Sequence, residues 1–188
     1  MVVIIGDVTI EPDQSSECTA LRLVEWTTNS FPTLTGTPGG DVLRLSHHIT
    51  MIYHKRGAPD EKFLRATQLA GIDQFSFTGR VNGILPVGDD KRGLIIMTFD
   101  LVQDMADASK HMWDHIIKET GETPKMTRRP EEIYKELHGF SAHITLASFA
   151  DLTAATKALS EMKDNSLLAY THLFHHKSVT LDNYRAIE

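Results

Sequence analysis

Two short segments of the chain carry the same pattern of histidine and hydroxyl side chains. The first is Ser46-His47-His48-Ile49-Thr50, and the second is Ser141-Ala142-His143-Ile144-Thr145. An imidazole has an unperturbed pKa of about 6.5, so two histidines can provide a base and an acid near neutral pH. Hydroxyl groups can donate hydrogen bonds to the non-bridging oxygens of a phosphate group. Residues of these types could therefore form a site for acid/base chemistry.

Both segments are rich in β-branched and apolar residues, so each is predicted to be a strand. Alternate residues of a strand share a face, because successive side chains point to opposite sides. Ser46, His48 and Thr50 are therefore expected on one face of the first strand. Ser141, His143 and Thr145 are expected on one face of the second. Two strands that direct these groups into the same space would form a site, and the rest of the chain would be its scaffold.

Strict alternation also makes predictions for the neighbouring residues. His47 is the rival of His48, but the strand parity and the spacing to Thr50 favour His48. Ala147 and Phe149 would share the face of His143, whereas Tyr53 would lie on the face opposite His48.

The size and composition of the chain are those of an ordinary globular protein. Its 188 residues suffice for one domain, or one domain with two lobes, and the formal net charge is −6. That charge argues against an extended nucleic-acid track but allows a small anionic ligand in a local pocket. Cys18 is the only cysteine, which excludes an internal disulfide. With no apolar run long enough for a signal peptide or membrane span, we expect a cytoplasmic monomer that contacts no membrane.

The order of predicted elements is mixed, with helices inserted between strands, which indicates the α+β class. Strands are predicted at 2–10, 20–26, 75–85, 94–102, 140–149 and within 173–187, and helices at 59–70, 104–120, 131–137 and 152–163. Gly71 and Gly121 mark helix ends, and Asp151 is a predicted N-cap. Residues 27–41 and 125–130 are predicted loops, and His172, His175 and His176 are predicted at a strand edge. Trp26 and Trp113 are expected in the core.

The paired motifs resemble those of a known superfamily. His48-Ile49-Thr50 and His143-Ile144-Thr145 match the two His-x-Thr/Ser signatures of the 2H phosphoesterases. That superfamily includes bacterial RNA 2′,3′-cyclic phosphodiesterases of the LigT type, plant and fungal cyclic phosphodiesterases, and viral enzymes that destroy oligonucleotide messengers. A Phe75-x-Phe77-x-Gly79 segment between the motifs adds to the resemblance, which extends over residues 42–187. Residues 1–41 show no such resemblance.

The resemblance implies a fold and an activity. The fold would be a pseudo-twofold antiparallel sheet in two lobes, with a central cleft and helices on the outer faces. His48 and His143 would be the acid/base pair, and Thr50 and Thr145 would donate to phosphate oxygens, with no cofactor. The substrate would be a nucleoside 2′,3′-cyclic phosphate, or a short linear or cyclic oligonucleotide with a 2′–5′ or 3′–5′ linkage. The sequence leaves open which histidine is the base.

Further residues are candidates for contacts with the substrate. Tyr53 and Phe149 end the two motif strands and could stack on a base, and Ser46 and Ser141 could be additional hydrogen-bond donors. Lys55, Arg56, Arg80 and the basic loop 125–130 could meet phosphates, although a solvated surface explains each of them as well.

Three other interpretations remain open at this stage. Short motif matches also occur by chance, and strand histidines are often plain core or edge residues. His111 and His115 have the i,i+4 spacing of helical zinc ligands, but the sequence shows neither an intervening glutamate nor a third ligand. A binding module that holds a nucleotide without cleaving it is the third interpretation. The presence of both motif histidines favours catalysis over such a module.

Overall fold

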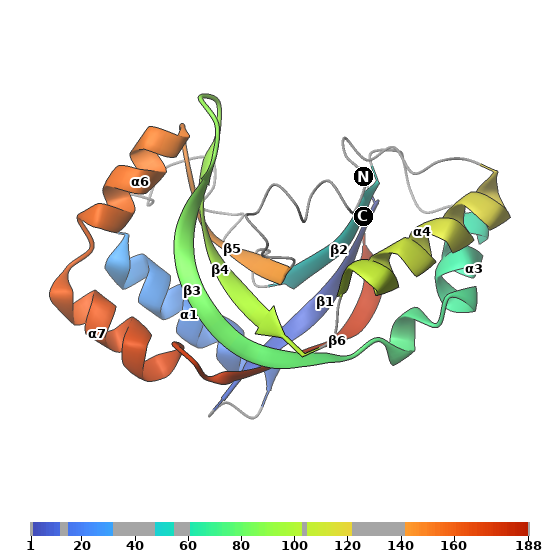
Figure 1. The fold of residues 1–188 in the computed structure, drawn as a ribbon, viewed down its shortest axis with the longest axis horizontal. Helices are drawn as coiled ribbons and strands as arrows, with labels where there is room; N and C mark the ends of the chain where they lie inside the picture. Colours follow the sequence, from blue (N-terminus) through green and yellow to red (C-terminus); the bar gives the residue numbers. More distant parts are fainter. Residues whose placement is uncertain are drawn as a thin grey trace.

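The computed structural model describes residues 2–11, 15–31, 48–54, 61–102, 105–121 and 142–187. Within these ranges lie six strands: β1 (Val2–Ile10), β2 (His48–His54), β3 (Phe77–Gly88), β4 (Gly93–Leu101), β5 (Ala142–Phe149) and β6 (Ser178–Ile187). The helices there are α1 (Ser16–Ser30), α3 (Glu61–Leu69), α4 (Met105–Thr120), α6 (Leu152–Ser160) and α7 (Asp164–Leu173), with a 3₁₀ turn η2 (Ile72–Gln74). The predicted α+β class is confirmed (Figure 1).

All six strands belong to one antiparallel sheet in the order β2-β1-β6-β3-β4-β5. The two motif strands, β2 and β5, are thus the outermost strands by hydrogen bonding. They nevertheless contact each other, because the sheet curls until its two edges meet (Figure 1). Strand twist accumulates across a sheet in one direction, which makes such curling favourable. The topology therefore brings together two segments that are far apart in the sequence.

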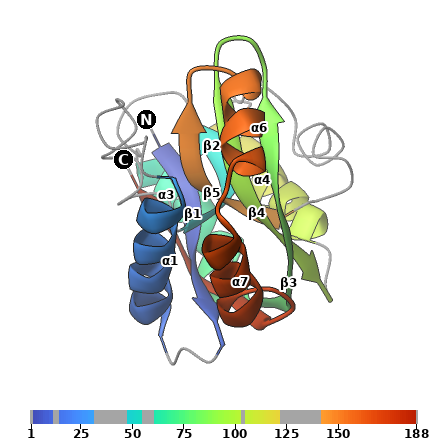
Figure 2. The same cartoon turned by 90° about the vertical axis from the view of Figure 1, so that its left-hand side faces the viewer.

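The helices form two groups at opposite ends of the curled sheet. α6 packs on β3, β4 and β5, and α1 packs on β1 and against α7, whereas α4 packs on β2 and against α3, as Figures 1 and 2 show. The indole Nε1 of Trp26 on α1 donates to the carbonyl of Ser166 on α7 at 3.0 Å. The Trp26 ring also packs against Phe31 and Phe174, with ring centroids 5.9 and 5.7 Å away. This arrangement confirms the two-lobed fold with outer helices.

The strand predicted over residues 20–26 is wrong, because these residues belong to α1. Ser15 caps the helix by accepting a hydrogen bond from the Cys18 amide at 3.2 Å. The buried residues recur every three or four positions, which is helical rather than strand spacing. They are Thr19, Leu23, Trp26, Thr27 and Ser30. Of residues 20–26, only Val24 and Trp26 favour strands, whereas the alanine, leucines, arginine and glutamate favour a helix. The packing of the buried face against β1 and α7 stabilises that helix.

Most of the other predicted elements are confirmed with small shifts in their ends. Gly71 and Gly121 follow helices with φ of 70° and 69°, a conformation that glycine adopts without strain. The carboxylate of Asp151 caps α6 by accepting from the Ala154 amide at 2.7 Å. The strand predicted over 75–85 extends to Gly88, and the β3–β4 turn lies at 89–92, where the Asp89 side chain accepts from the amides of Lys91 and Arg92. The loop predicted over 27–41 is wrong at its start, because residues 27–30 form the last turn of α1. Its part beyond Phe31, the basic loop 125–130 and the helix 131–137 lie outside the described residues.

The three histidines near the C-terminus do not form a strand edge as predicted. His172 is in the last turn of α7, and His175 and His176 are in the turn that leads to β6. His176 has a φ of 59°, in the left-handed region that side chains rarely adopt. No helix in the described part of the chain is long and apolar enough to cross a membrane.

Candidate active site

The motif strands β2 and β5 alternate between buried apolar residues and partly exposed polar ones. In β2, His48 is partly exposed and Thr50 exposed, whereas Ile49 between them is 1% exposed. In β5, His143 and Thr145 are partly exposed, whereas Ile144 is fully buried at 1% exposure. Each strand thus anchors its apolar face in the core and leaves its histidine and threonine on the other face.

Both motif strands carry a β-bulge directly after the threonine. Ile5 of β1 pairs with Thr50 and Ile4 pairs with Ile52, so Met51 is the extra residue in β2. Ile96 of β4 pairs with Thr145 and Ile95 pairs with Ala147, so Leu146 is the extra residue in β5. A bulge of this kind bends a strand and redirects the side chains that follow it. The two motifs therefore share their backbone geometry as well as their residues.

The bulge in β5 overturns one expectation based on strict alternation. Leu146 and Ala147 are consecutive yet both buried, at 0% and 1% exposure. Residues beyond the bulge have the opposite parity, so Ala147 and Phe149 leave the face of His143. The Phe149 ring is partly buried and packs against Phe31 of the core, with ring centroids 6.4 Å apart. A role for Phe149 in stacking on a substrate base is therefore unsupported.

Other sequence candidates lie outside the described part of the structure. Ser46, Ser141, Lys55, Arg56 and the basic loop are not among the described residues, and neither is the side chain of Tyr53. Arg80 is exposed on β3, where its cross-strand partners are Asp100 and Ser178.

His143 lies between the buried strand β4 and the neighbouring edge strand β2. Its partner across the ladder is Thr98, which is fully buried and donates from Oγ1 to the Gly83 carbonyl at 3.3 Å. The His143 ring is partly exposed, but its Nδ1 atom is buried and has no hydrogen-bond partner. This burial lowers the pKa of His143 from the ordinary 6.5 to about 4, because desolvation disfavours the charged imidazolium. The imidazole is therefore neutral at neutral pH.

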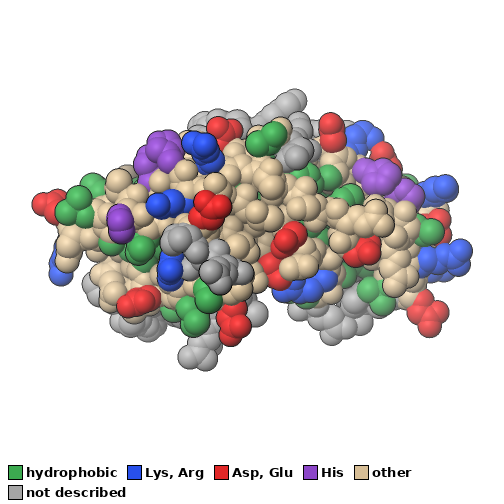
Figure 3. Space-filling view, turned by 90° about the horizontal axis from the view of Figure 1, so that it is seen from below, with side chains coloured by type: hydrophobic (Ala, Val, Ile, Leu, Met, Phe, Trp, Pro, Cys, Tyr) green, Lys and Arg blue, Asp and Glu red, His purple; other side chains and the backbone are tan. Residues whose placement is uncertain are grey.

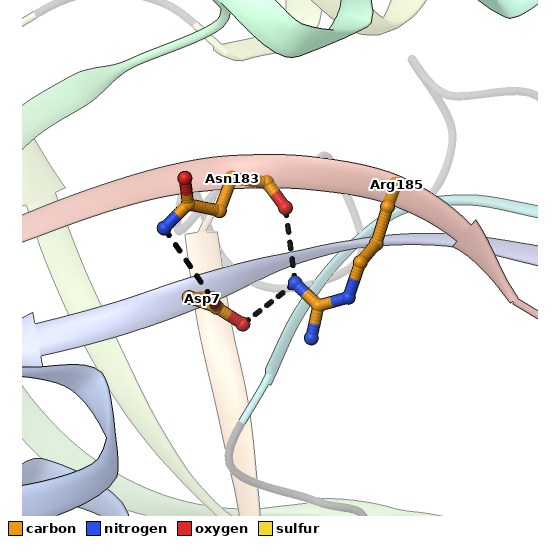
Figure 4. A network of polar contacts seen from close by, with 3 residues as sticks. All are labelled: Asp7, Asn183 and Arg185. Carbon is orange, nitrogen blue, oxygen red and sulfur yellow. Dashed lines mark hydrogen bonds and ion pairs between the residues drawn. The ribbon is translucent and has the colours of Figure 1, made fainter.

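His48 has a different neighbour across the ladder. Its partner on β1 is Asp7, which in turn pairs with Asp182 on β6. Figure 4 shows that Asp7 is held by two residues of β6. Arg185 Nη1 donates to Asp7 Oδ1 at 2.7 Å and to the Asn183 carbonyl at 3.0 Å, and Asn183 Nδ2 lies 3.4 Å from Asp7 Oδ2. Residues directly opposite in a ladder share a face, so this charged group lies beside His48.

Sequence analysis missed Asp7 and Arg185. Asp7 is a carboxylate in the middle of an otherwise apolar predicted strand, which is a signal in itself. Its position beside His48 depends on the pairing of β1 with β2, which the sequence does not show.

The rival histidine pair lies on α4. The rings of His111 and His115 are 4.7 Å apart at an interplanar angle of 70°, in an edge-to-face arrangement. No group of three or more His, Cys, Asp or Glu side chains arranged to hold a metal ion occurs among the residues that the structure describes. The metal-site interpretation thus gains no third ligand from this part of the chain.

The fold is similar to that of a protein whose structure has been solved. Usb1 from Kluyveromyces marxianus superposes with a TM-score of 0.52 at 10% sequence identity, over 99% of this chain and 92% of that chain. At this identity the likeness is one of fold. It extends over nearly the whole chain, including β1 and α1. No family model matches the sequence, and no curated protein does.

Proposed function

We propose that this protein is a phosphodiesterase that uses His48 and His143 as its acid/base pair. The observation that supports it is the meeting of β2 and β5 at the two edges of one curled sheet. Each strand carries the same His-x-Thr pattern and the same bulge after the threonine. A coincidental match of five residues would not explain why both copies also share a face pattern, a bulge and a common location.

In this proposal His143 is the general base and His48 the general acid. A buried, neutral imidazole can accept a proton from the attacking hydroxyl or water without first losing one of its own. The phosphate of a bound substrate adds a negative charge nearby, which raises the pKa of His143 towards the working pH. His48 would then protonate the leaving oxygen. Thr50 and Thr145 would donate hydrogen bonds to the non-bridging oxygens, where charge shifts during the reaction.

The proposed substrate is a nucleoside 2′,3′-cyclic phosphate or a short oligonucleotide with a 2′–5′ or 3′–5′ linkage. A long nucleic-acid track requires a stripe of basic side chains. On the face shown in Figure 3, acidic and basic side chains of the described residues are interspersed, with no stripe of one sign. Together with the net charge of −6, this favours a small or short substrate.

The test is hydrolysis of a panel of substrates in the presence of EDTA. The panel contains 2′,3′-cyclic nucleotides, a 2′–5′ oligoadenylate, and cyclic di- and trinucleotides. We expect wild-type turnover of at least one compound, reduced by a factor of about 10² to 10⁴ in His48→Ala and in His143→Ala. His111→Ala is the matched control, since it removes an exposed histidine of α4. Full activity in His48→Ala would contradict the assignment of the site, and loss of turnover in EDTA would contradict the metal-independent mechanism.

A further inference from the structure

We propose that Asp7 is a positioning residue for His48, which orients the imidazole and stabilises its protonated form. This inference rests on the proposed function, because it takes His48 to be the general acid. Asp7 belongs to the N-terminal strand, in the region of the chain for which the sequence showed no resemblance.

The first argument is the register of the sheet. Asp7 and His48 are direct partners across the β1–β2 ladder. Side chains of such partners lie on the same face with Cβ atoms about 4.5 to 5.5 Å apart. The adjacent pairs Gly6–Ile49 and Ile5–Thr50 continue the same register along the two strands, and Asp7–His48 is the last pair of this ladder. A carboxylate at this separation is within reach of an imidazole ring.

The second argument is that Asp7 is fixed in place. Its side chain is 24% exposed, and each of its two oxygens has a partner on β6. The β6 strand has a bulge opposite Gly6, where Asn183 adopts a φ of 52°. Asparagine tolerates this left-handed conformation. The side-chain amide of Asn183 contacts Asp7, and its backbone carbonyl accepts a hydrogen bond from Arg185. A carboxylate held at both oxygens keeps its orientation while the histidine exchanges protons.

The third argument is the local charge on the face of His48. Asp7 and Asp182 are opposite each other across β1 and β6, and Arg185 provides one positive charge. The three charged groups sum to one net negative charge, which favours a protonated His48. The strand β5, which contacts β2, carries His143, and burial keeps that histidine neutral.

The helix that packs on β2 does not add charge to this face. The buried residues of α4, Met105, Met112 and Ile116, belong to the same apolar core as Ile49 and Met51. The charged side chains of α4 therefore lie away from the His48 face. The two candidate catalytic histidines thus have opposite surroundings, with desolvation around His143 and carboxylates beside His48. Paired titratable groups whose surroundings differ in this way are typical of divided acid and base roles.

The experiment compares Asp7→Asn with Arg185→Gln in the full chain. The readout is the titration midpoint of His48, followed by the NMR signal of its ring proton and assigned by its absence in His48→Gln. We expect Asp7→Asn to lower the midpoint by about one pH unit, because a nearby negative charge is lost. Arg185→Gln should raise the midpoint, because the charge of Asp7 is no longer offset. The basic limb of the pH profile of kcat/KM should move in the same two directions.

Asp100→Asn is the matched control, because Asp100 is also a strand carboxylate with an arginine, Arg80, as its cross-strand partner. It should leave the His48 titration unchanged. If the ion pair between Asp7 and Arg185 is merely structural, the titration midpoint of His48 should shift in the same direction in Asp7→Asn and Arg185→Gln, or not shift at all. Either result would overturn the proposal. If the midpoints shift as expected but wild type cleaves nothing in the panel, only the proposed function fails. If the enzyme is active and the midpoints do not move, only the role of Asp7 fails.

Discussion

The two motif strands are alike in sequence and backbone but unlike in their neighbours. β2 and β5 both present His-x-Thr, and both have a bulge after the threonine. His143 pairs with the buried Thr98 of an inner strand, whereas His48 pairs with the charged Asp7. The comparison shows that a repeated motif supplies equivalent side chains, whereas the residues on the neighbouring strands can give the two copies different surroundings. Two identical histidines become useful as an acid and a base only when their surroundings separate them.

The largest expected effect concerns how the two histidines depend on each other. If they transfer protons in one step, the double variant His48→Ala/His143→Ala should lose about as much activity as either single variant. Groups that act as a unit in catalysis show such non-additive losses. The measurement is kcat/KM for the best substrate of the panel in all four proteins. If the losses of kcat/KM in the two single variants multiply in the double variant, the two histidines act independently.

The next effect concerns stability and pH. The folded-state pKa of His143 is about 4, below its ordinary value of 6.5. Between these values the unfolded chain binds a proton at this residue and the folded chain does not. Acidification from pH 6.5 to pH 4 should therefore lower the free energy of unfolding, by at most about 3 kcal/mol for this one residue. The part of the ring that meets solvent reduces this figure.

Urea unfolding at several pH values measures this contribution. On acidification, the free energy of unfolding of His143→Gln should fall less than that of wild type. The free energy of unfolding of His48→Gln should still include the decrease that His143 causes in wild type. If the two variants respond alike, the contrast between the two halves of the site is wrong.

The smallest effect compares two glycines beside the two histidines. Gly6 precedes Asp7 in β1, and a Cβ atom added there would lie 2.7 Å from the Tyr184 ring. Gly83 accepts the hydrogen bond of Thr98, the partner of His143, and a Cβ there would meet nothing within 4 Å. Gly6→Ala should cost about 1 to 3 kcal/mol of unfolding free energy. Gly83→Ala should change it by less than about 0.5 kcal/mol, as open sites usually do. Equal effects in urea unfolding would show that the β1 side is no more tightly packed than the β3 side.

Local patterns predicted most elements of the fold correctly. Apolar residues at strand and helix spacing, the glycines after α3 and α4, and the cap at Asp151 act over a few residues, so they are visible in the sequence. The strand predicted over residues 20–26 is wrong because so short a segment does not show its helical spacing. Over the full length of α1 the buried residues recur at helical spacing, and they pack against β1 and α7.

The sequence by itself determined the chemistry that is available: two histidines and two threonines, each pair on one face of a strand. Tertiary structure decided the rest. The curl of the sheet brought β2 and β5 together, the bulge in β5 removed Phe149 from the face of His143, and strand order placed Asp7 beside His48. Register, bulges and strand order depend on pairing between segments that are distant along the chain. Because no short window of residues contains both members of such a pair, these features were decided only when the sheet formed.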